Sequence, residues 1–234
     1  MSEAAPLRAI VLADGDGPDG AALDARWPGW SRDVGLVVAA DGGARLATPL
    51  ALRIDRWVGD GDSLSSAEID QLRVAGVLVE LVDPDKDESD AELAVIAAVG
   101  AGATDLTILG ALGGPRLDHA LANVALLAHP VLAGRAARLL DATTKVSIVT
   151  GPGVGGTSEA AVFEGRVGDV VSLLSLSPTV EDITTTGLRY PLRDEALTLG
   201  PARGLSNVRT DATATISVRE GRLLVIESPA TLPP

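Results

Sequence analysis

Acidic and glycine residues gather in four short segments of the first half of the chain, each following an apolar run. These segments are residues 41–44 (DGGA), 59–63 (GDGDS), 85–92 (DKDESDAE) and 110–123 (GALGGPRLDHALAN). Carboxylates are the ligands of hard divalent cations, and glycine amides, lysine and arginine are the groups that bind phosphates. The four segments therefore suggest chemistry on a metal-bound phosphate compound.

Asp60 and Asp62 lie one residue apart in a segment flanked by glycines. Two carboxylates at this spacing can converge on one hard cation, and Asp87 can add a third oxygen ligand to it. A solvated turn is the alternative, because Asp62 and Ser63 also precede an expected helix start.

In the segment 41–44, Asp41 is followed by Gly42 and Gly43. An acid and two glycines at the carboxyl end of a strand allow a ligand to approach the backbone closely. An ordinary turn from a strand to a helix has the same composition.

The segments 85–92 and 110–123 supply the basic groups. Lys86 is one of two lysines in the chain, and it is flanked by acids just before a helix N-terminus; a solvated charged face is the alternative. The amides of the glycine-rich loop and the guanidinium of Arg116 can cradle a polyphosphate. His119, taken alone, is more often structural than an acid–base group, and two histidines exclude a multi-histidine metal site.

Apolar runs and helix signals predict the elements that carry these segments. The expected strands, buried on both faces, cover residues 9–12, 36–39, 56–58, 77–80 and 106–109. Helices are expected from Ser65 or Ser66 to about Val74, from a Ser89/Glu92 capping box to about Val99, and over 117–127. This alternation predicts a mostly parallel, doubly wound α/β domain, in which the strand ends share one edge and bring the four segments together.

The pattern changes after the glycine-rich break at 151–156. Short β-type runs follow, punctuated by turn signals, at residues 160–163, 170–174, 197–199, 214–218 and 223–226. They predict a small antiparallel β-sandwich. We therefore expect two domains, an α/β catalytic domain over 1–150 that binds nucleotide and magnesium, and an all-β domain over 151–234.

Composition limits the partners. The 234 residues carry a formal charge of −13, which argues against nucleic acid and anionic membranes, and aromatic residues make up 2%. Apolar runs near the N-terminus are too short for a signal peptide or a membrane span. The chain has no cysteine, which excludes thiolate chemistry and points to a cytoplasmic location. No P-loop or protein-kinase motif is present, so those two phosphotransferase classes are excluded.

The ordered set of motifs resembles the thiamine pyrophosphokinase (thiamine diphosphokinase) family. Its catalytic-domain motifs are similar to the four segments above, and its thiamine-binding signature is similar to residues 186–192 (TGLRYPL), 197–200 (LTLG) and 204–207 (GLSN). The resemblance covers residues 9–226. It implies an α/β domain followed by a β-sandwich, a homodimer, and transfer of the diphosphate of ATP to the thiamine hydroxyl with release of AMP.

The resemblance also implies roles for individual residues. Asp60, Asp62 and Asp87 would hold Mg²⁺, with Lys86 and Arg116 as further catalytic groups. Ser206 and Asn207 would contact thiamine, with Tyr190 nearby. The nucleotide and diphosphate would be bound by Asp41, Gly42, Gly43, Asp90, Gly113, Gly114, Asp118, His119 and Asn123.

Two positions depart from the family pattern. Gly61 stands where the family usually has an aromatic residue, and Pro115 is an extra residue before Arg116. Two alternative functions remain at this stage. One is a diphosphokinase for another heterocyclic alcohol, such as a hydroxymethylpterin, and the other is a non-catalytic thiamine or nucleotide sensor.

Overall fold

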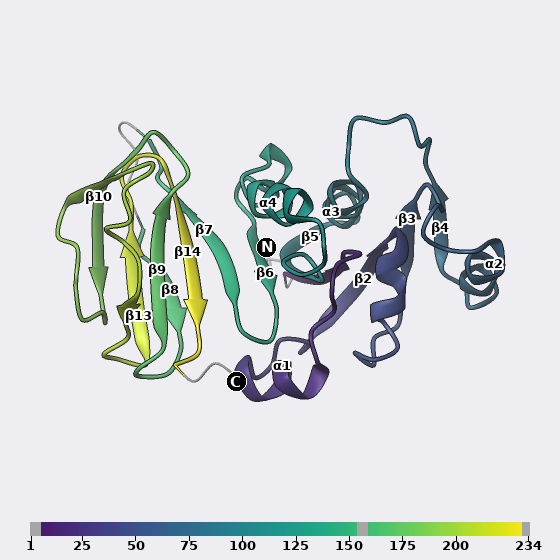
Figure 1. The fold of residues 1–234 in the computed structure, drawn as a ribbon, viewed down its shortest axis with the longest axis horizontal. Helices are drawn as coiled ribbons and strands as arrows, with labels where there is room; N and C mark the ends of the chain where they lie inside the picture. The colour runs from purple at the N-terminus through teal and green to yellow at the C-terminus, as the bar shows by residue number, and fades with distance from the viewer. Residues whose placement is uncertain (1–5, 154–158, 231–234) are drawn as a thin grey trace, which may run out of the picture. The chain divides into compact units, whose positions relative to one another are not determined.

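The computed structural model describes residues 6–153 and 159–230 (Figure 1). The chain forms two compact units, Met1–Ala142 and Thr143–Pro234. Strand β7 (Lys145–Thr150), which the sequence analysis placed in the first domain, pairs antiparallel with β14 (Arg222–Ser228) of the second unit. Residues 154–156 of the predicted glycine-rich break lie outside the described residues. None of the helices in the described part has the length and apolar composition that a membrane crossing requires.

The first unit is built on six parallel strands in the order β6-β5-β1-β2-β3-β4. The strands are β1 (Leu7–Leu12), β2 (Val34–Ala40), β3 (Arg56–Gly59), β4 (Leu78–Leu81), β5 (Ala103–Leu109) and β6 (Ala136–Leu140). The chain moves outward from β1 in one direction through β2, β3 and β4, and in the other through β5 and β6. The loops after β1 and β5 therefore flank the point where the strand order reverses, which is where open α/β sheets bind their ligands.

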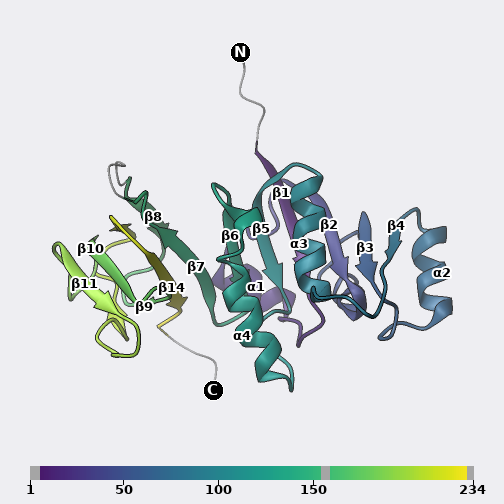
Figure 2. The same ribbon diagram turned by 90° about the horizontal axis from the view of Figure 1, so that it is seen from above.

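Helices lie on both faces of these strands, as the doubly wound prediction requires. They are α1 (Gly20–Arg26), α2 (Ser66–Val74), α3 (Asp90–Gly100) and α4 (Leu117–Leu126), with two 3₁₀ helices, η1 (Asp41–Leu46) and η2 (Pro130–Leu132). Figure 2 shows α3 and α4 on one side of the strands and α1 on the other. The core includes Ile10, Leu12 and Trp57, which are fully buried. All three tryptophans, Trp27, Trp30 and Trp57, belong to this unit.

Serine caps start two of the predicted helices. Ser65 and Glu68 form a reciprocal capping box at α2. At α3, the Ser89 side chain accepts from the Glu92 amide at 3.2 Å, but the Glu92 carboxylate pairs with His129 Nε2 at 3.4 Å instead of completing the box.

Strand β4 corrects the expectation of burial on both faces. Leu78 and Leu81 are 58% and 54% exposed, because β4 is the edge strand of the sheet. The apolar run gave the right secondary structure, but not the position of the strand in the sheet.

The second unit contains two antiparallel sheets, in agreement with the predicted β-sandwich. One has the order β12-β9-β14-β7 and the other the order β11-β10-β13-β8. The strands not yet given are β8 (Ala161–Glu164), β9 (Val170–Ser175), β10 (Thr179–Thr186), β11 (Glu195–Thr198), β12 (Asn207–Val208) and β13 (Thr213–Ser217). Inward residues of both sheets, such as Leu173, Ile183, Ile216 and Leu223, form one apolar core.

Candidate active site

The loops after β1 and β5 meet at the switch point of the first unit. The Gly15 amide donates to the Gly110 carbonyl at 2.9 Å, and the Gly114 amide donates to Asp16 Oδ2 at 3.0 Å. The sequence analysis selected the glycine-rich loop with Gly113 and Gly114, but it missed Asp14 and Asp16. The available signal was an acid–glycine–acid pattern directly after a buried strand.

Glycine is required where these loops approach one another. A Cβ on Gly42 would overlap the carboxylate of Asp14, and one on Gly43 would overlap the carbonyl oxygen of Leu12. A Cβ on Gly59 would lie 2.8 Å from the Cβ of Asp41. The sequence predicted that these glycines let a ligand approach the backbone at 41–44. In the structure, what approaches Gly42 and Gly43 is the end of β1 and the loop after it.

Asp41 is the buried acid of the site. It is 2% exposed and has a φ of +39°, a left-handed conformation that costs energy for any residue with a Cβ. The indole Nε1 of Trp57 donates to its carbonyl at 2.9 Å, and the Ser63 amide donates to its Oδ2 at 3.1 Å. Its other oxygen, Oδ1, is buried and has no hydrogen-bond partner within the described part of the chain. Burial raises the pKa of the Asp41 carboxyl above its ordinary value.

Asp41, Asp60 and Asp62 form a group of carboxylates whose nearest oxygens lie within 4.8 Å of one another. Three carboxylates, one with a buried oxygen that no group of the described residues satisfies, form a donor set suited to a hard divalent cation. The structure thus brings Asp60 and Asp62 together, as the sequence predicted, and adds Asp41 to them. Asp87 is exposed and is not in this group.

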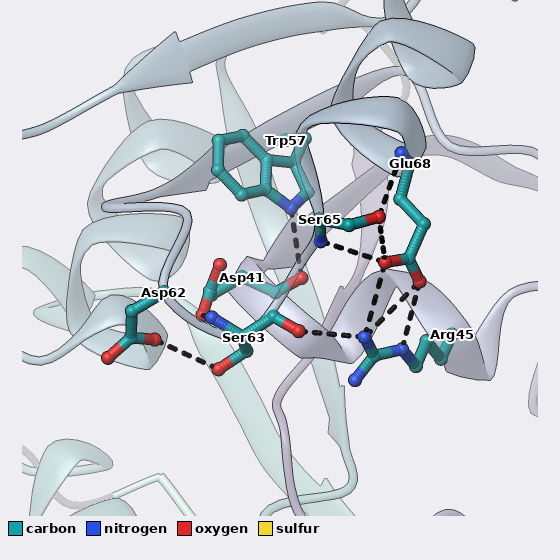
Figure 3. Close-up of polar contacts among 7 residues, drawn as sticks. All are labelled: Asp41, Arg45, Trp57, Asp62, Ser63, Ser65 and Glu68. Atoms are coloured by element: carbon teal, nitrogen blue, oxygen red, sulfur yellow. Dashed lines mark hydrogen bonds and ion pairs between the residues drawn. The ribbon is translucent and has the colours of Figure 1, made fainter.

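Hydrogen bonds from η1 hold the 59–63 loop in place, and the start of α2 contributes through its contact with Arg45 (Figure 3). Arg45 of η1 donates to the Ser63 carbonyl at 2.7 Å and pairs with Glu68 at 3.2 Å. Glu68 in turn accepts from Ser65 in the capping box. Within the loop, the Ser63 hydroxyl donates to Asp62 Oδ1 at 3.0 Å. Arg45 and Glu68 were not selected from the sequence, because nothing in their local pattern shows that they meet.

Gly61, at the position where the family usually has an aromatic residue, has a φ of +79°. A Cβ there would lie 3.1 Å from Ile69 Cδ1 and 3.6 Å from Leu81 Cδ2. A side chain at this position would therefore pack beneath the loop, and Gly61 leaves that contact unmade.

Lys86 lies between two acids of the site. Its ammonium is 3.0 Å from Asp60 Oδ2 and 3.2 Å from Asp90 Oδ1, and its side chain is largely buried. The hydrogen bond from Lys86 lowers the pKa of Asp60, so that this carboxylate stays ionised and able to bind a cation. The placement favours a site group over the solvated charged face that the sequence alone allowed.

At the N-terminus of α4, Arg116 and Asp118 are exposed and paired with each other. The guanidinium binds the carboxylate through two contacts, Nε to Oδ1 at 2.9 Å and Nη2 to Oδ2 at 2.6 Å. This pairing lowers the pKa of Asp118 to about 2. Asn123, one helical turn further along, donates to the Ala111 carbonyl at 3.0 Å and so holds the glycine-rich loop, while His119 is exposed.

The predicted thiamine-contacting residues lie in the second unit. Asn207 is buried and bonded to the backbone of Tyr190, whose side chain is 66% exposed. Ser206 is exposed and has a φ of +57°.

Comparison with known families matches both units. Residues 30–138 match "Thiamin pyrophosphokinase, catalytic domain", and residues 162–223 match "Thiamin pyrophosphokinase, vitamin B1 binding domain". A curated relative, the thiamine pyrophosphokinase of Bacillus subtilis (strain 168), is 29% identical over 170 residues, which are 73% of this chain and 76% of the relative.

Solved structures of the same family share the fold. The thiamin pyrophosphokinase of Geobacillus thermodenitrificans is 27% identical, with a TM-score of 0.73 and coverage of 95% of this chain and 97% of that one. The thiamin pyrophosphokinase family protein of Enterococcus faecalis superposes with a TM-score of 0.78 at 24% identity, covering 96% of this chain and 100% of that one.

A parallel α/β unit with a carboxylate cluster beside its switch point, joined to a β-sandwich unit, defines a two-domain transferase of the nucleotide-dependent class. The two family matches together cover more than half of the chain. The chain belongs to the thiamin pyrophosphokinase family. It is an ATP-dependent diphosphotransferase, with thiamine and ATP as substrates.

Proposed function

We propose that the diphosphate of ATP passes to thiamine at the carboxyl edge of the first unit's sheet, through the residues that meet there. The thiamine hydroxyl oxygen attacks the β-phosphorus, the bond from that phosphorus to the oxygen bridging it to the α-phosphorus breaks, and AMP leaves. The hydroxyl proton passes to solvent or to a nearby carboxylate, because a loose transition state needs no strong base. The observation that carries this assignment is the carboxylate group of Asp41, Asp60 and Asp62 beside Lys86.

We propose that Asp41, Asp60 and Asp62 hold Mg²⁺, with Asp87 as a further ligand by resemblance. The cation, when bound, neutralises phosphate charge. The buried Oδ1 of Asp41, which has no partner in residues 6–153 and 159–230, would gain one in this way. Lys86 holds Asp60 and Asp90 in place and adds positive charge next to the cluster.

The pairing of Arg116 with Asp118 supports a phosphate-binding role for this arginine. A guanidinium that binds a carboxylate through two contacts has the geometry to bind two phosphate oxygens in the same way. We propose that Arg116 exchanges Asp118 for the phosphates of ATP. The backbones of Gly42, Gly43, Gly113 and Gly114 would line the same nucleotide site, where the small size of these residues lets the loops after the strands pack against one another. Asp90, His119 and Asn123 belong to the same nucleotide site in this proposal.

Product analysis tests the reaction. The purified protein is incubated with ATP, MgCl₂ and thiamine, and the nucleotides and thiamine esters are separated. We expect AMP and thiamine diphosphate in equal amounts, and neither product with EDTA. Formation of ADP and thiamine monophosphate would contradict diphosphate transfer. Stabilisation by thiamine without any turnover would favour a sensor, and turnover of a hydroxymethylpterin in place of thiamine would change the acceptor.

Three further assignments are proposals of the same kind. A homodimer, expected from the resemblance, predicts a sedimentation mass near twice 23.8 kDa. A preference for Mg²⁺ over Ca²⁺ is tested by titrating both cations in the product assay. A cytoplasmic location rests on the cysteine-free composition and is tested by cell fractionation.

A further inference from the structure

Asn207 joins the two segments of the second unit that carry the thiamine-binding signature. Its side chain is buried, and its Oδ1 accepts from the amides of Tyr190 at 3.0 Å and Val208 at 2.9 Å. Its Nδ2 donates to the Tyr190 carbonyl at 2.7 Å. The side-chain amide therefore bonds both backbone groups of Tyr190.

Backbone hydrogen bonds continue this connection on the next residues. The Arg189 amide donates to the Val208 carbonyl at 2.9 Å, and the Thr210 amide donates to the Gly187 carbonyl at 2.9 Å. The Asn207 backbone pairs on its other side with Val171 of β9. The Asn207 side chain thus bonds the N–H and C=O of Tyr190 as a backbone peptide group of a neighbouring strand would. It adds one residue pair to the backbone pairing between residues 187–189 and 208–210.

The hydrogen bonds leave Asn207 little capacity to bind a substrate. An amide oxygen has two lone pairs, and both face backbone N–H groups; one of the two amide hydrogens faces a carbonyl. These partners also determine which side-chain atom is oxygen and which is nitrogen. The neighbouring Ser206 differs, because it is exposed and its hydroxyl has no partner among the described residues.

The backbone of Ser206 supports this division of roles. Its left-handed φ of +57° is unfavourable for serine, and the hydrogen bond from its amide to the Ser172 hydroxyl, 3.0 Å long, helps to maintain it. Strain of this kind is found where a side chain must be presented in one direction.

We propose that Asn207 is a positioning residue for thiamine, and that Ser206 and Tyr190 make the contacts. Asn207 fixes the backbone of Tyr190 relative to the Ser206 turn, so that one rigid surface meets the substrate. The proposal rests on the proposed function, and it replaces the direct contact that the resemblance implied for Asn207.

A double-mutant cycle tests it. Asn207→Ala, Tyr190→Ala and the double variant are compared in KM for thiamine, with Thr210→Ala as a control on an exposed neighbour. We expect Asn207→Ala to raise this KM about 10-fold, since two amides lose their acceptor, with kcat and the KM for ATP within about 2-fold. The KM for thiamine of the double variant should not exceed the higher of the two single-variant values, because Asn207 acts through Tyr190. Additive losses would overturn the proposal.

Two further measurements separate positioning from contact. Hydrogen exchange at the Tyr190 amide should become faster in Asn207→Ala without any ligand, and unchanged protection would overturn the proposal. The ratio of KM values for thiamine and an analogue with an oxygen in place of the pyrimidine amino group should shift in Ser206→Ala and stay constant in Asn207→Ala. A shift in Asn207→Ala as large as that in Ser206→Ala would show direct contact.

Two controls keep the result interpretable. If Asn207→Ala does not fold, Asn207→Asp keeps both acceptor contacts and places a carboxylate oxygen against the Tyr190 carbonyl, where the two oxygens repel. It should also raise the KM for thiamine while leaving the KM for ATP within about 2-fold. If the wild-type protein neither binds nor converts thiamine, the proposed function is wrong. The hydrogen-exchange experiment needs no ligand, so it still tests separately whether Asn207 holds the backbone of Tyr190.

Discussion

The amide of Ser63 donates to Oδ2 of Asp41 across 3.1 Å, while Oδ1 of the same buried carboxylate has no partner in the part of the chain that the structure describes. This hydrogen bond connects the end of β2 to the loop after β3, the two places that supply the carboxylate cluster. A buried acid with a left-handed backbone and an unsatisfied oxygen lowers stability in two ways. Such a residue is best explained by the ligand that the free oxygen would bind.

Asp41→Asn should separate stability from activity. Burial raises the pKa of Asp41, so the ionised group destabilises the folded state at pH values above that raised pKa, and the effect disappears below the ordinary carboxyl pKa. Removing the charge should therefore leave Tm at pH 7 equal or higher, while activity falls at least ~10²-fold. We also expect Mg²⁺ to raise the Tm of the wild-type protein and to leave that of Asp41→Asn unchanged. Asp70→Asn, an exposed control, should retain activity, and wild-type activity in Asp41→Asn would contradict the metal assignment.

The pKa of Asp118 reports on Arg116. In the folded protein the pair lowers this pKa to about 2, so Asp118 remains ionised well below the range of an ordinary carboxyl. A lowered pKa means that the pairing is complete above the ordinary value and is lost as the pH falls through the folded value. NMR titration of the carboxyl carbon should show the midpoint move up toward 3.8 in Arg116→Gln. An unchanged midpoint would mean that Arg116 does not hold Asp118 in solution.

Gly43→Ala should disrupt the site, because its Cβ would overlap the Leu12 carbonyl in the centre of the sheet. Backbone atoms cannot move aside as a flexible side chain can, so we expect a loss of several degrees in Tm together with most of the activity. Gly100→Ala provides the matched control, since nothing lies within 4 Å of its added Cβ. Equal Tm values for the two variants would show that the β1–η1 approach is looser than described.

Ser65→Ala should destabilise the start of α2 by about 1 kcal/mol, the usual effect of losing a serine N-cap. Chemical denaturation measures the change, and Ser66→Ala, one residue into the helix, controls for the loss of a hydroxyl. Since Glu68 connects this cap to Arg45 and the 59–63 loop, Mg²⁺ affinity should fall as well. Full Mg²⁺ affinity in Ser65→Ala would separate the cap from the metal loop.

Glu227→Ala should be among the most destabilising single changes in the second unit. Glu227 and Arg209 are 3% and 1% exposed and lie 2.6 Å apart, and Lys145 contacts the other carboxylate oxygen at 2.7 Å. Removing one partner leaves a buried arginine uncompensated, which typically costs about 3–5 kcal/mol. Glu195→Ala removes an exposed ion pair with Arg203 and should change stability by less than about 1 kcal/mol.

The sequence predicted the elements where local signals were strong. The runs that became β1, β2, β3 and β5 and the caps of α2 and α3 were identified, because apolar periodicity and serine caps are local properties. Elements with weaker signals were missed. Helix α1 has only seven residues, and in β10 a register shift places two acids between the buried Val180 and Ile183, which breaks the alternation of a regular strand.

Of the residues that the sequence predicted for the candidate site, the structure brings some together and leaves others apart. Asp60, Asp62, Lys86 and Asp41 lie together because all four follow parallel strands whose ends share an edge. The sequence does not show how far a loop folds back over that edge. The sequence therefore did not show that Asp41, and not Asp87, is the third member of the carboxylate group. It also did not show that Arg45 contacts Ser63, or that the side-chain amide of Asn207 is bonded to Tyr190.

The location of all three tryptophans in the first unit has a practical consequence for spectroscopy. Trp57 donates to the Asp41 carbonyl, and the second unit has Tyr190 and Phe163 but no indole. Emission excited selectively in indole rings therefore follows the first unit alone. Comparing it with the circular dichroism of the whole chain would show whether the α/β unit and the sandwich unfold in one transition or in two.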